Sequence, residues 1–188
     1  MQSLENFGTR FALANNRKEV AGWIRDKFIS FGYHDATLYS FQLNRWFLGF
    51  FYQTWQYNLV CIYEDYLRPG SIFVLGAHHD SVNTYPWADS FIIAPDADDS
   101  ASGVARTLEI ARIMKKRDYA PAYTIKLVTF PAEEFGLHGT WYFANMAFNS
   151  GMNIACMINN DMISHTSKTR QDWTVKVKNY SNSDYLPI

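Results

Sequence analysis

Several features that would assign this chain to a specialised class of protein are missing from its sequence. Only two cysteines are present, Cys61 and Cys156, and each lies within an apolar stretch. We interpret them as buried thiols on strands, with a disulfide or a reactive site as the alternative. No stretch of eighteen apolar residues occurs, so no membrane-spanning helix is expected. The N-terminus lacks a basic region followed by an apolar run, so as it stands it is not a signal peptide.

Charge of one sign is also scarce. The formal net charge is −1, and no long run of lysine and arginine or of acidic residues is present. The basic surface that nucleic acids require is therefore missing, and so is a polybasic patch for a membrane surface. A charge balance of this kind is compatible with a small polar substrate.

Aromatic residues, by contrast, are abundant. They make up 17% of the 188 residues, a length that suits one domain with a substantial core. Residues 44–55 are intensely aromatic and follow neither the helical nor the strand period. We predict a buried hairpin or a packed loop there, and the alternative is a pocket wall or a partner surface.

The apolar pattern predicts an α/β domain. Amphipathic helices are expected over 2–13 and 16–31, and near 100–116 and 136–149. Strands are expected over 36–43, 57–63, 71–77, 123–130 and 153–159, the last three as buried central strands because their apolar runs are continuous. Their alternation with helices predicts a mixed β-sheet with parallel central strands flanked by helices.

Acidic and imidazole side chains follow these strands at the points where they end. Strand 71–77 runs into His78-His79-Asp80, strand 123–130 into Pro131-Ala-Glu-Glu134, and strand 153–159 into Asn160-Asp161. A loop rich in aspartate, Ala94-Pro-Asp-Ala-Asp-Asp-Ser100, precedes the helix near 100. Ligands of open α/β sheets bind beyond the carboxyl ends of the strands, so we expect these clusters to meet there.

Such a concentration of carboxylates needs a compensating charge, and a divalent cation would supply it. Each cluster alone has an ordinary explanation: an aspartate beside a histidine, a helix cap, or a solvated helix start. Their joint occurrence at strand ends is specific. Mixed imidazole and carboxylate ligands without cysteine suit zinc, with manganese or cobalt as alternatives. A bridging carboxylate would allow two ions about 3.5–4 Å apart.

Taken together, four segments resemble the co-catalytic zinc aminopeptidases, peptidase family 28 of the metallopeptidases. They are Gly76-Ala-His-His-Asp-Ser81, Ala94-Pro-Asp-Ala-Asp-Asp-Ser-Ala-Ser-Gly103, Phe130-Pro-Ala-Glu-Glu-Phe-Gly-Leu-His-Gly139 and Ile158-Asn-Asn-Asp-Met162. The resemblance spans residues 15–163 and implies a zinc-exopeptidase-like fold. Residues 1–188 would then form a single zinc-peptidase catalytic domain.

The resemblance also implies a set of ligands for two Zn²⁺ ions. His78 and Asp161 look like ligands of one ion, Glu134 like a ligand of the other, and Asp98 like the carboxylate that bridges them. In the family, the peptide bond that matches Asp98–Asp99 is usually cis.

Two further residues resemble parts of the family's catalytic machinery. Glu133 matches the general base, and Asp80 the carboxylate that orients the ligand histidine. Asp96 stands where many relatives have glycine, and we expect it to face solvent; tuning of the site's rim is the alternative. We expect His79 and His138 not to be ligands.

One element of the family's site is absent. Family members supply a last histidine ligand from a loop well downstream of the residue matching Asp161, whereas this chain has only His165 in its last 27 residues. His165 lies too close to Asp161 for that part. The run Trp173-Thr-Val-Lys-Val-Lys178 looks like the start of a strand. We therefore expect a domain incomplete at its C-terminus, lacking about its last third.

The function that the resemblance implies is aminopeptidase action on a peptide with a free N-terminus. A water activated by two zinc ions would attack the peptide bond, with Glu133 as base. One alternative is a single-zinc enzyme like the glutaminyl cyclases, and another is a non-catalytic binding domain on the same scaffold. Relatives are often exported. Substrate preference, oligomeric state and compartment are not readable from the sequence.

Overall fold

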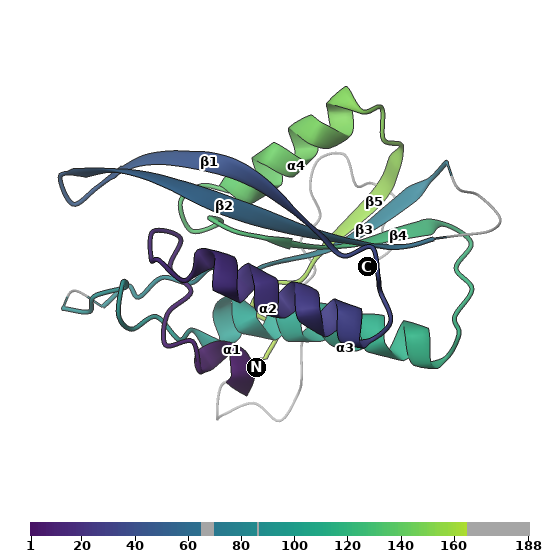
Figure 1. The fold of residues 1–188 in the computed structure, drawn as a ribbon, viewed down its shortest axis with the longest axis horizontal. Coiled ribbons are helices and arrows are strands. Elements are labelled where there is room, and N and C mark those ends of the chain that lie inside the picture. Colours follow the sequence, from purple (N-terminus) through teal and green to yellow (C-terminus); the bar gives the residue numbers. More distant parts are fainter. Residues whose placement is uncertain (65–69, 86, 165–188) are drawn as a thin grey trace.

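The computed structural model describes residues 1–64, 70–85 and 87–164 and is built around a five-stranded sheet (Figure 1). The strand order is β1-β2-β4-β3-β5. β1 (Thr37–Phe47) and β2 (Phe50–Tyr63) form an antiparallel hairpin, and β2 also pairs antiparallel with β4 (Thr124–Phe130). β3 (Ile72–His78) runs parallel to both β4 and β5 (Ile154–Asn159). The predicted mixed sheet with parallel strands flanked by helices is confirmed.

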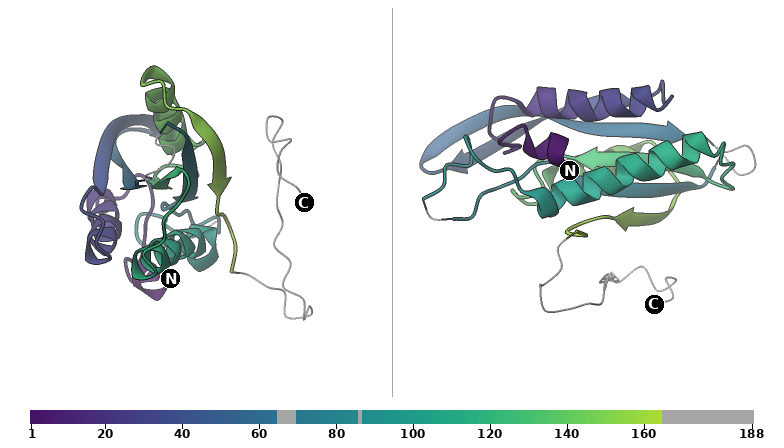
Figure 2. Two further views of the ribbon diagram at one scale, coloured as in Figure 1. Left: turned by 90° about the vertical axis from the view of Figure 1, so that its right-hand side faces the viewer. Right: turned by 90° about the horizontal axis from the view of Figure 1, so that it is seen from below.

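Helices cover both faces of this sheet. α2 (Arg17–Ser30) and α3 (Gly103–Lys116) lie on one face, and α4 (His138–Asn149) lies on the other (Figures 1 and 2). The main core forms where α2 and α3 pack on the sheet, and it includes Ile24 and Phe28 of α2, Val104 of α3, and Leu59 and Leu127 of the strands. This layering fixes β3 and β4 relative to α3 and α4, the helices that follow them in the chain.

The N-terminal segment does not form the predicted helix over 2–13. Helix α1 spans only Gln2–Glu5. The chain then turns at Gly8, whose φ of +72° suits glycine, and Thr9 forms an isolated parallel bridge with Ala94. Phe11 is fully buried in a second apolar cluster. Long-range contacts of residues 9–14 therefore outweigh their helical spacing.

The aromatic segment, residues 44–55, forms part of the β1–β2 hairpin, and a hairpin was one of the two predicted arrangements. It is not buried, however: Trp46 is 69% exposed and Phe50 is 68% exposed.

Most of the side chains of β5 are also exposed, and in the described residues this strand is the outermost one of the sheet. The prediction of a buried central strand over 153–159 was wrong for the part of the chain that the structure describes, in which β5 pairs with β3 on one side only. Cys61 is buried and Cys156 half-buried, and both are free thiols.

The three parallel strands end at one edge of the sheet. A short irregular turn, η1 (Ala97–Ser102), leads into α3 beside this edge. The first residue of α3 lies very close to the segment that follows β5: a Cβ at Gly103 would lie 2.3 Å from the carbonyl oxygen of Asn160. Glycine is therefore required for this contact, which holds η1 against the end of β5.

No helix in residues 1–64, 70–85 and 87–164 combines the length and the apolar character that crossing a membrane requires.

Substitution of Gly103 tests the close contact between α3 and the end of β5. We expect Gly103→Ala to lower the free energy of unfolding by about 1–3 kcal/mol, because the added methyl group meets backbone atoms. Gly22→Ala is the matched control: a Cβ at Gly22 in α2 meets nothing within 4 Å, so this change should stabilise the protein by about 0.5–1 kcal/mol. Urea unfolding measures the free energy of unfolding of both variants. Equal stability of the two would contradict the close contact between Gly103 and the end of β5.

Candidate metal centre

His78 lies at the centre of a cluster of carboxylates. It is the last residue of β3, and its side chain is almost fully buried. Its Nε2 atom lies 2.7 Å from Oδ1 of Asp99 in η1 and 3.5 Å from Oδ1 of Asp161, which follows β5. One donor atom from each of these three residues lies within 4.8 Å of the others. His78 precedes Asp99 by 21 residues and Asp161 follows it by 62 residues, so three separate segments of the chain meet at this point.

A second group of possible metal ligands lies beside the first. Asp96, Asp99 and Glu134 also bring one carboxylate oxygen each within 4.8 Å of one another. Asp99 belongs to both groups, so its carboxylate stands where a shared ligand of two ions would stand. Asp96, expected to face solvent, is instead partly buried, and its Oδ1 accepts a hydrogen bond from the Asp99 backbone N–H at 3.2 Å.

Asp98, the expected bridging carboxylate, belongs to neither group. Its Oδ1 accepts hydrogen bonds from the backbone N–H and the hydroxyl of Ser164, at 2.8 and 2.9 Å. The backbone of Asp99 is extended (φ −102°, ψ 97°), which turns its side chain towards His78 while that of Asp98 points to Ser164. The cis peptide bond, expected at Asp98–Asp99, is at Asp99–Ser100. In this structure, therefore, the carboxylate beside His78 and the cis peptide bond both lie one residue later in the chain than expected.

Asp80 connects His78 to the segment after β4. Its two carboxylate oxygens accept hydrogen bonds from the backbone N–H groups of Glu133 and Glu134, at 3.0 and 3.2 Å. The same carboxylate lies 3.5 Å from Nδ1 of His78, on the side of the ring away from Asp99. Asp80 is fully buried. It therefore fixes Glu133 and Glu134 relative to the histidine, in keeping with an orienting role.

The carboxylates change the proton affinity of the groups among them. Burial by itself lowers the pKa of His78, but hydrogen bonding to Asp161, Asp80 and Asp99 outweighs it and raises that pKa well above the usual value. Burial and the negative charges of Asp99 and Asp80 raise the pKa of Glu134 to about 7. Burial also raises the pKa of Glu133. Without a metal, protons supply part of the positive charge that this site requires.

The donor set fits a divalent cation. Oε1 of Glu134 is buried and has no hydrogen-bond partner among the described residues. A buried carboxylate oxygen left without a partner is costly, and coordination of a cation would satisfy it. One imidazole with several carboxylates suits zinc or manganese.

The remaining histidines lie outside both groups. The ring of His79 contacts the hydroxyl of Thr129 at 3.2 Å, and burial lowers its pKa to about 4. His138 begins α4, and His34 is an exposed residue after α2. His165 and the predicted strand over 173–178 lie outside the described residues.

Three residues of the site were missed or given another part by sequence reasoning. No local signal tells Asp99 from its neighbour Asp98 as the residue that faces His78. Asp96 was set aside because it replaces a glycine of the family motif. The third is Arg10, a buried residue that donates hydrogen bonds to the carbonyls of His79 and Asp96; the one signal for it in the sequence is a charge directly before the apolar run Phe11-Ala-Leu-Ala14.

Comparison with known proteins connects this geometry to a family. A protein from Pyrenophora tritici-repentis named "Probable zinc metalloprotease" is 42% identical over 98 residues, covering 52% of this chain and 22% of that protein. Leucine aminopeptidase 1 of Fusarium vanettenii is 30% identical over 176 residues, covering 90% of this chain and 42% of the relative. The chain thus spans less than half the length of these relatives.

Solved structures share the fold. LapB from Legionella pneumophila has a TM-score of 0.66 at 23% identity, covering 86% of this chain and 41% of that one. A glutaminyl cyclase from Fimbriiglobus ruber has a TM-score of 0.70 at 16% identity, covering 88% and 60%. At these identities the likeness concerns the fold alone.

The match to a family model is more specific than either. Residues 58–185 match the model of peptidase family M28, a range that contains β3, β4, β5 and the His78, Asp99, Glu134 and Asp161 positions. Because this match covers more than half of the sequence, the chain belongs to peptidase family M28.

Proposed function

We propose that this chain carries most of a two-zinc site that hydrolyses peptide bonds and releases N-terminal residues. The observation that carries the proposal is the position of Asp99, whose carboxylate is common to two groups of possible ligands. Membership of a peptidase family and the names of the relatives support peptide hydrolysis. The single-zinc cyclase and the binding domain are less well supported, because a shared carboxylate between two ligand groups has no use in either.

Four protein segments would hold the two ions in this proposal. His78 and Asp161 would bind one ion, Glu134 and Asp96 the other, and Asp99 both. Asp98, the bridging ligand that the resemblance implies, would instead anchor the segment after β5 through Ser164. Zinc at these positions would supply a Lewis acid for the scissile carbonyl and a bound water of lowered pKa.

The side chains around the ligands would perform the proton transfers. Glu133, raised in pKa by burial, would accept the proton of the attacking water and pass it to the leaving amine. Asp80 would hold Glu133 through its backbone N–H and keep His78 oriented. A free substrate amine would find negative charge at this edge of the sheet, in agreement with N-terminal exopeptidase action.

Substitution of Glu133 tests the proposed base. We expect Glu133→Gln to lower kcat for an aminoacyl substrate by about 10²–10⁴-fold while the zinc content is unchanged, because only the proton acceptor is lost. Glu134→Gln is the neighbouring control, and it should lower the zinc content itself. Turnover and elemental analysis of the purified proteins measure both effects. Retained turnover in Glu133→Gln would reject the base, and ammonia release from an N-terminal glutamine peptide would favour a cyclase.

Substitution of Asp98 and of Asp99 in turn tests which of these adjacent aspartates is the bridging ligand. We expect Asp99→Asn to weaken zinc binding by more than about tenfold, because one carboxylate serves both ligand groups. Asp98→Asn should leave the affinity nearly unchanged, because the hydrogen bonds to Ser164 can be kept in part by the amide oxygen. Zinc titration against a chelator measures both affinities. The opposite order of effects would return the bridging role to Asp98.

The raised pKa values predict that metal binding releases protons. A ligand must lose its proton before it binds, and both His78 and Glu134 hold theirs more tightly than usual. Since the pKa of Glu134 is about 7, affinity should fall more steeply with decreasing pH below that value than above it. Calorimetry in buffers of different ionisation enthalpy should give about one proton released near pH 8 and about two near pH 6. Binding without proton release would contradict this.

A further inference from the structure

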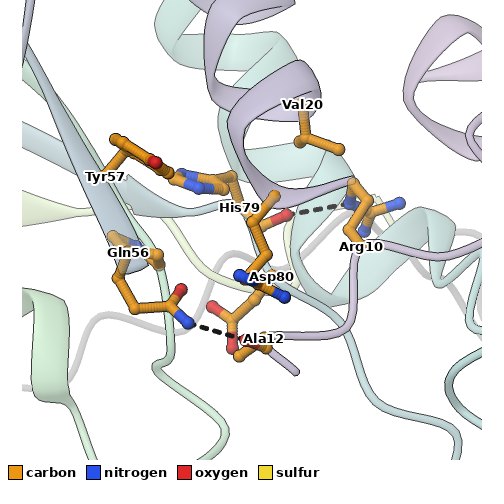
Figure 3. A pocket seen from close by; sticks show the side chains of 9 residues that line it. Arg10, Ala12, Val20, Gln56, Tyr57, His79 and Asp80 are labelled. Carbon is orange, nitrogen blue, oxygen red and sulfur yellow. Dashed lines mark hydrogen bonds between the residues drawn. The ribbon is translucent and has the colours of Figure 1, made fainter. Parts of the chain in front are cut away.

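Arg10 is a buried cation whose guanidinium group donates hydrogen bonds only to backbone carbonyls in the described part of the chain. The residue is 3% exposed. Its Nε donates to the carbonyl of His79 at 2.9 Å, a bond drawn in Figure 3, and its Nη2 to that of Asp96 at 2.8 Å. Its Nη1 donates to Pro95 at 2.6 Å and, at the longer distance of 3.4 Å, to Leu4.

These carbonyls belong to the two loops that carry the candidate ligands. His79 lies between His78 and Asp80, in the loop after β3, and Asp96 lies three residues before Asp99. One rigid guanidinium group therefore spans the two loops and sets the distance between them. Arginine suits this task because its planar group presents five N–H donors in fixed directions.

Ser81 reinforces the same connection. The backbone of Arg10 pairs with it in both directions: the Arg10 N–H donates to the Ser81 hydroxyl at 3.2 Å, and the Ser81 N–H donates to the Arg10 carbonyl at 3.3 Å. The Ser81 hydroxyl donates in turn to the carbonyl of Ala94 at 2.6 Å. Arg10 and Ser81 together form what we call the loop clamp, a hydrogen-bonded link between residues 78–81 and 94–96.

The position of the clamp argues against a role in folding alone. A buried charge is costly, but the Arg10 donors satisfy carbonyls of both loops, which an apolar residue would leave unpaired. The charge of Arg10 also lies close enough to Asp96 and Asp80 to interact with them electrostatically, so its influence reaches the carboxylates of the candidate site itself. A cavity of only about 10 Å³, lined by Arg10, His79 and Asp80, adjoins it and is too small for a substrate. Arg10 therefore contacts the loops that carry the candidate ligands through their backbone carbonyls.

We propose that Arg10 is a positioning residue of the metal centre: by clamping the His79 and Asp96 carbonyls, it sets the separation of His78 from Asp99. The proposal rests on the proposed metal site. It gives the N-terminal segment, which lies outside the matched residues 58–185, a part in forming that site.

The test compares two arginines of the N-terminal segment in the full chain. Arg10→Lys keeps the charge but loses the fork of donors. Arg17→Lys is the matched control, because Arg17 lines the same cavity but its hydrogen bonds in the described residues go to the carbonyls of Ala14 and Trp55, outside both loops. Co²⁺ affinity by chelator competition, the Co²⁺ d–d absorption spectrum and the urea midpoint of the metal-free protein are measured for each.

We expect Arg10→Lys to bind Co²⁺ about 10–100-fold more weakly, with an altered spectrum, and Arg17→Lys to match the wild type in both. An unchanged affinity and spectrum in Arg10→Lys would overturn the proposal. Equal losses in both variants, in proportion to their urea midpoints, would also overturn it, since the effect would then be one of stability. Wild-type protein that binds no Co²⁺ would reject the metal site itself, a different result.

A second variant tests the clamp if Arg10→Lys does not fold. Ser81→Ala keeps Arg10 and its charge but removes the hydroxyl that joins the Arg10 backbone to Ala94. We expect it to weaken Co²⁺ binding severalfold and to change the spectrum in the same direction. Wild-type affinity and an unchanged spectrum in Ser81→Ala would contradict the clamp.

Discussion

Repulsion among carboxylates at one edge of the sheet is the constraint on which the rest of this structure depends. Parallel pairing of β3 with β4 and β5 brings three strand ends together, and each continues into acidic residues. Like charges at such distances are unfavourable at low dielectric. The fold must therefore supply positive charge and hydrogen-bond donors at this edge.

The structure supplies hydrogen-bond donors and positive charge at this edge in two ways. Backbone N–H groups of Glu133 and Glu134 donate to the buried Asp80, so one carboxylate is stabilised by the segment that carries two others. His78 retains its proton far more tightly than usual among Asp99 and Asp161. A cation bound between these groups would replace that proton. The stabilising interactions of the free site thus also prepare it for a metal ion.

Residues behind the site come from the part of the chain that precedes the residues 58–185 matched by the family model. α2 and the segment before it pack on the sheet beside α3, and Arg10 reaches from this segment to two loops of the site. Gly103 acts in a similar way from the other side, since its lack of a side chain lets α3 approach Asn160. The ligands owe their positions to contacts made by residues that would not touch the metal.

Much of the fold and the outline of the site were determined by the sequence alone. Continuous apolar runs predict β3 and β4 at nearly their observed bounds, and acidic residues after them predict where charge gathers, because both signals are local. Which of Asp98 and Asp99 faces His78 is not local. It depends on the backbone angles of η1, which the packing of α3 and the Asp96 and Ser164 hydrogen bonds set. The same holds for Arg10: only the tertiary structure brings its donors to carbonyls 69 and 86 residues away. Spacing along the chain therefore identified the chemistry, and long-range contacts decided which side chains carry it.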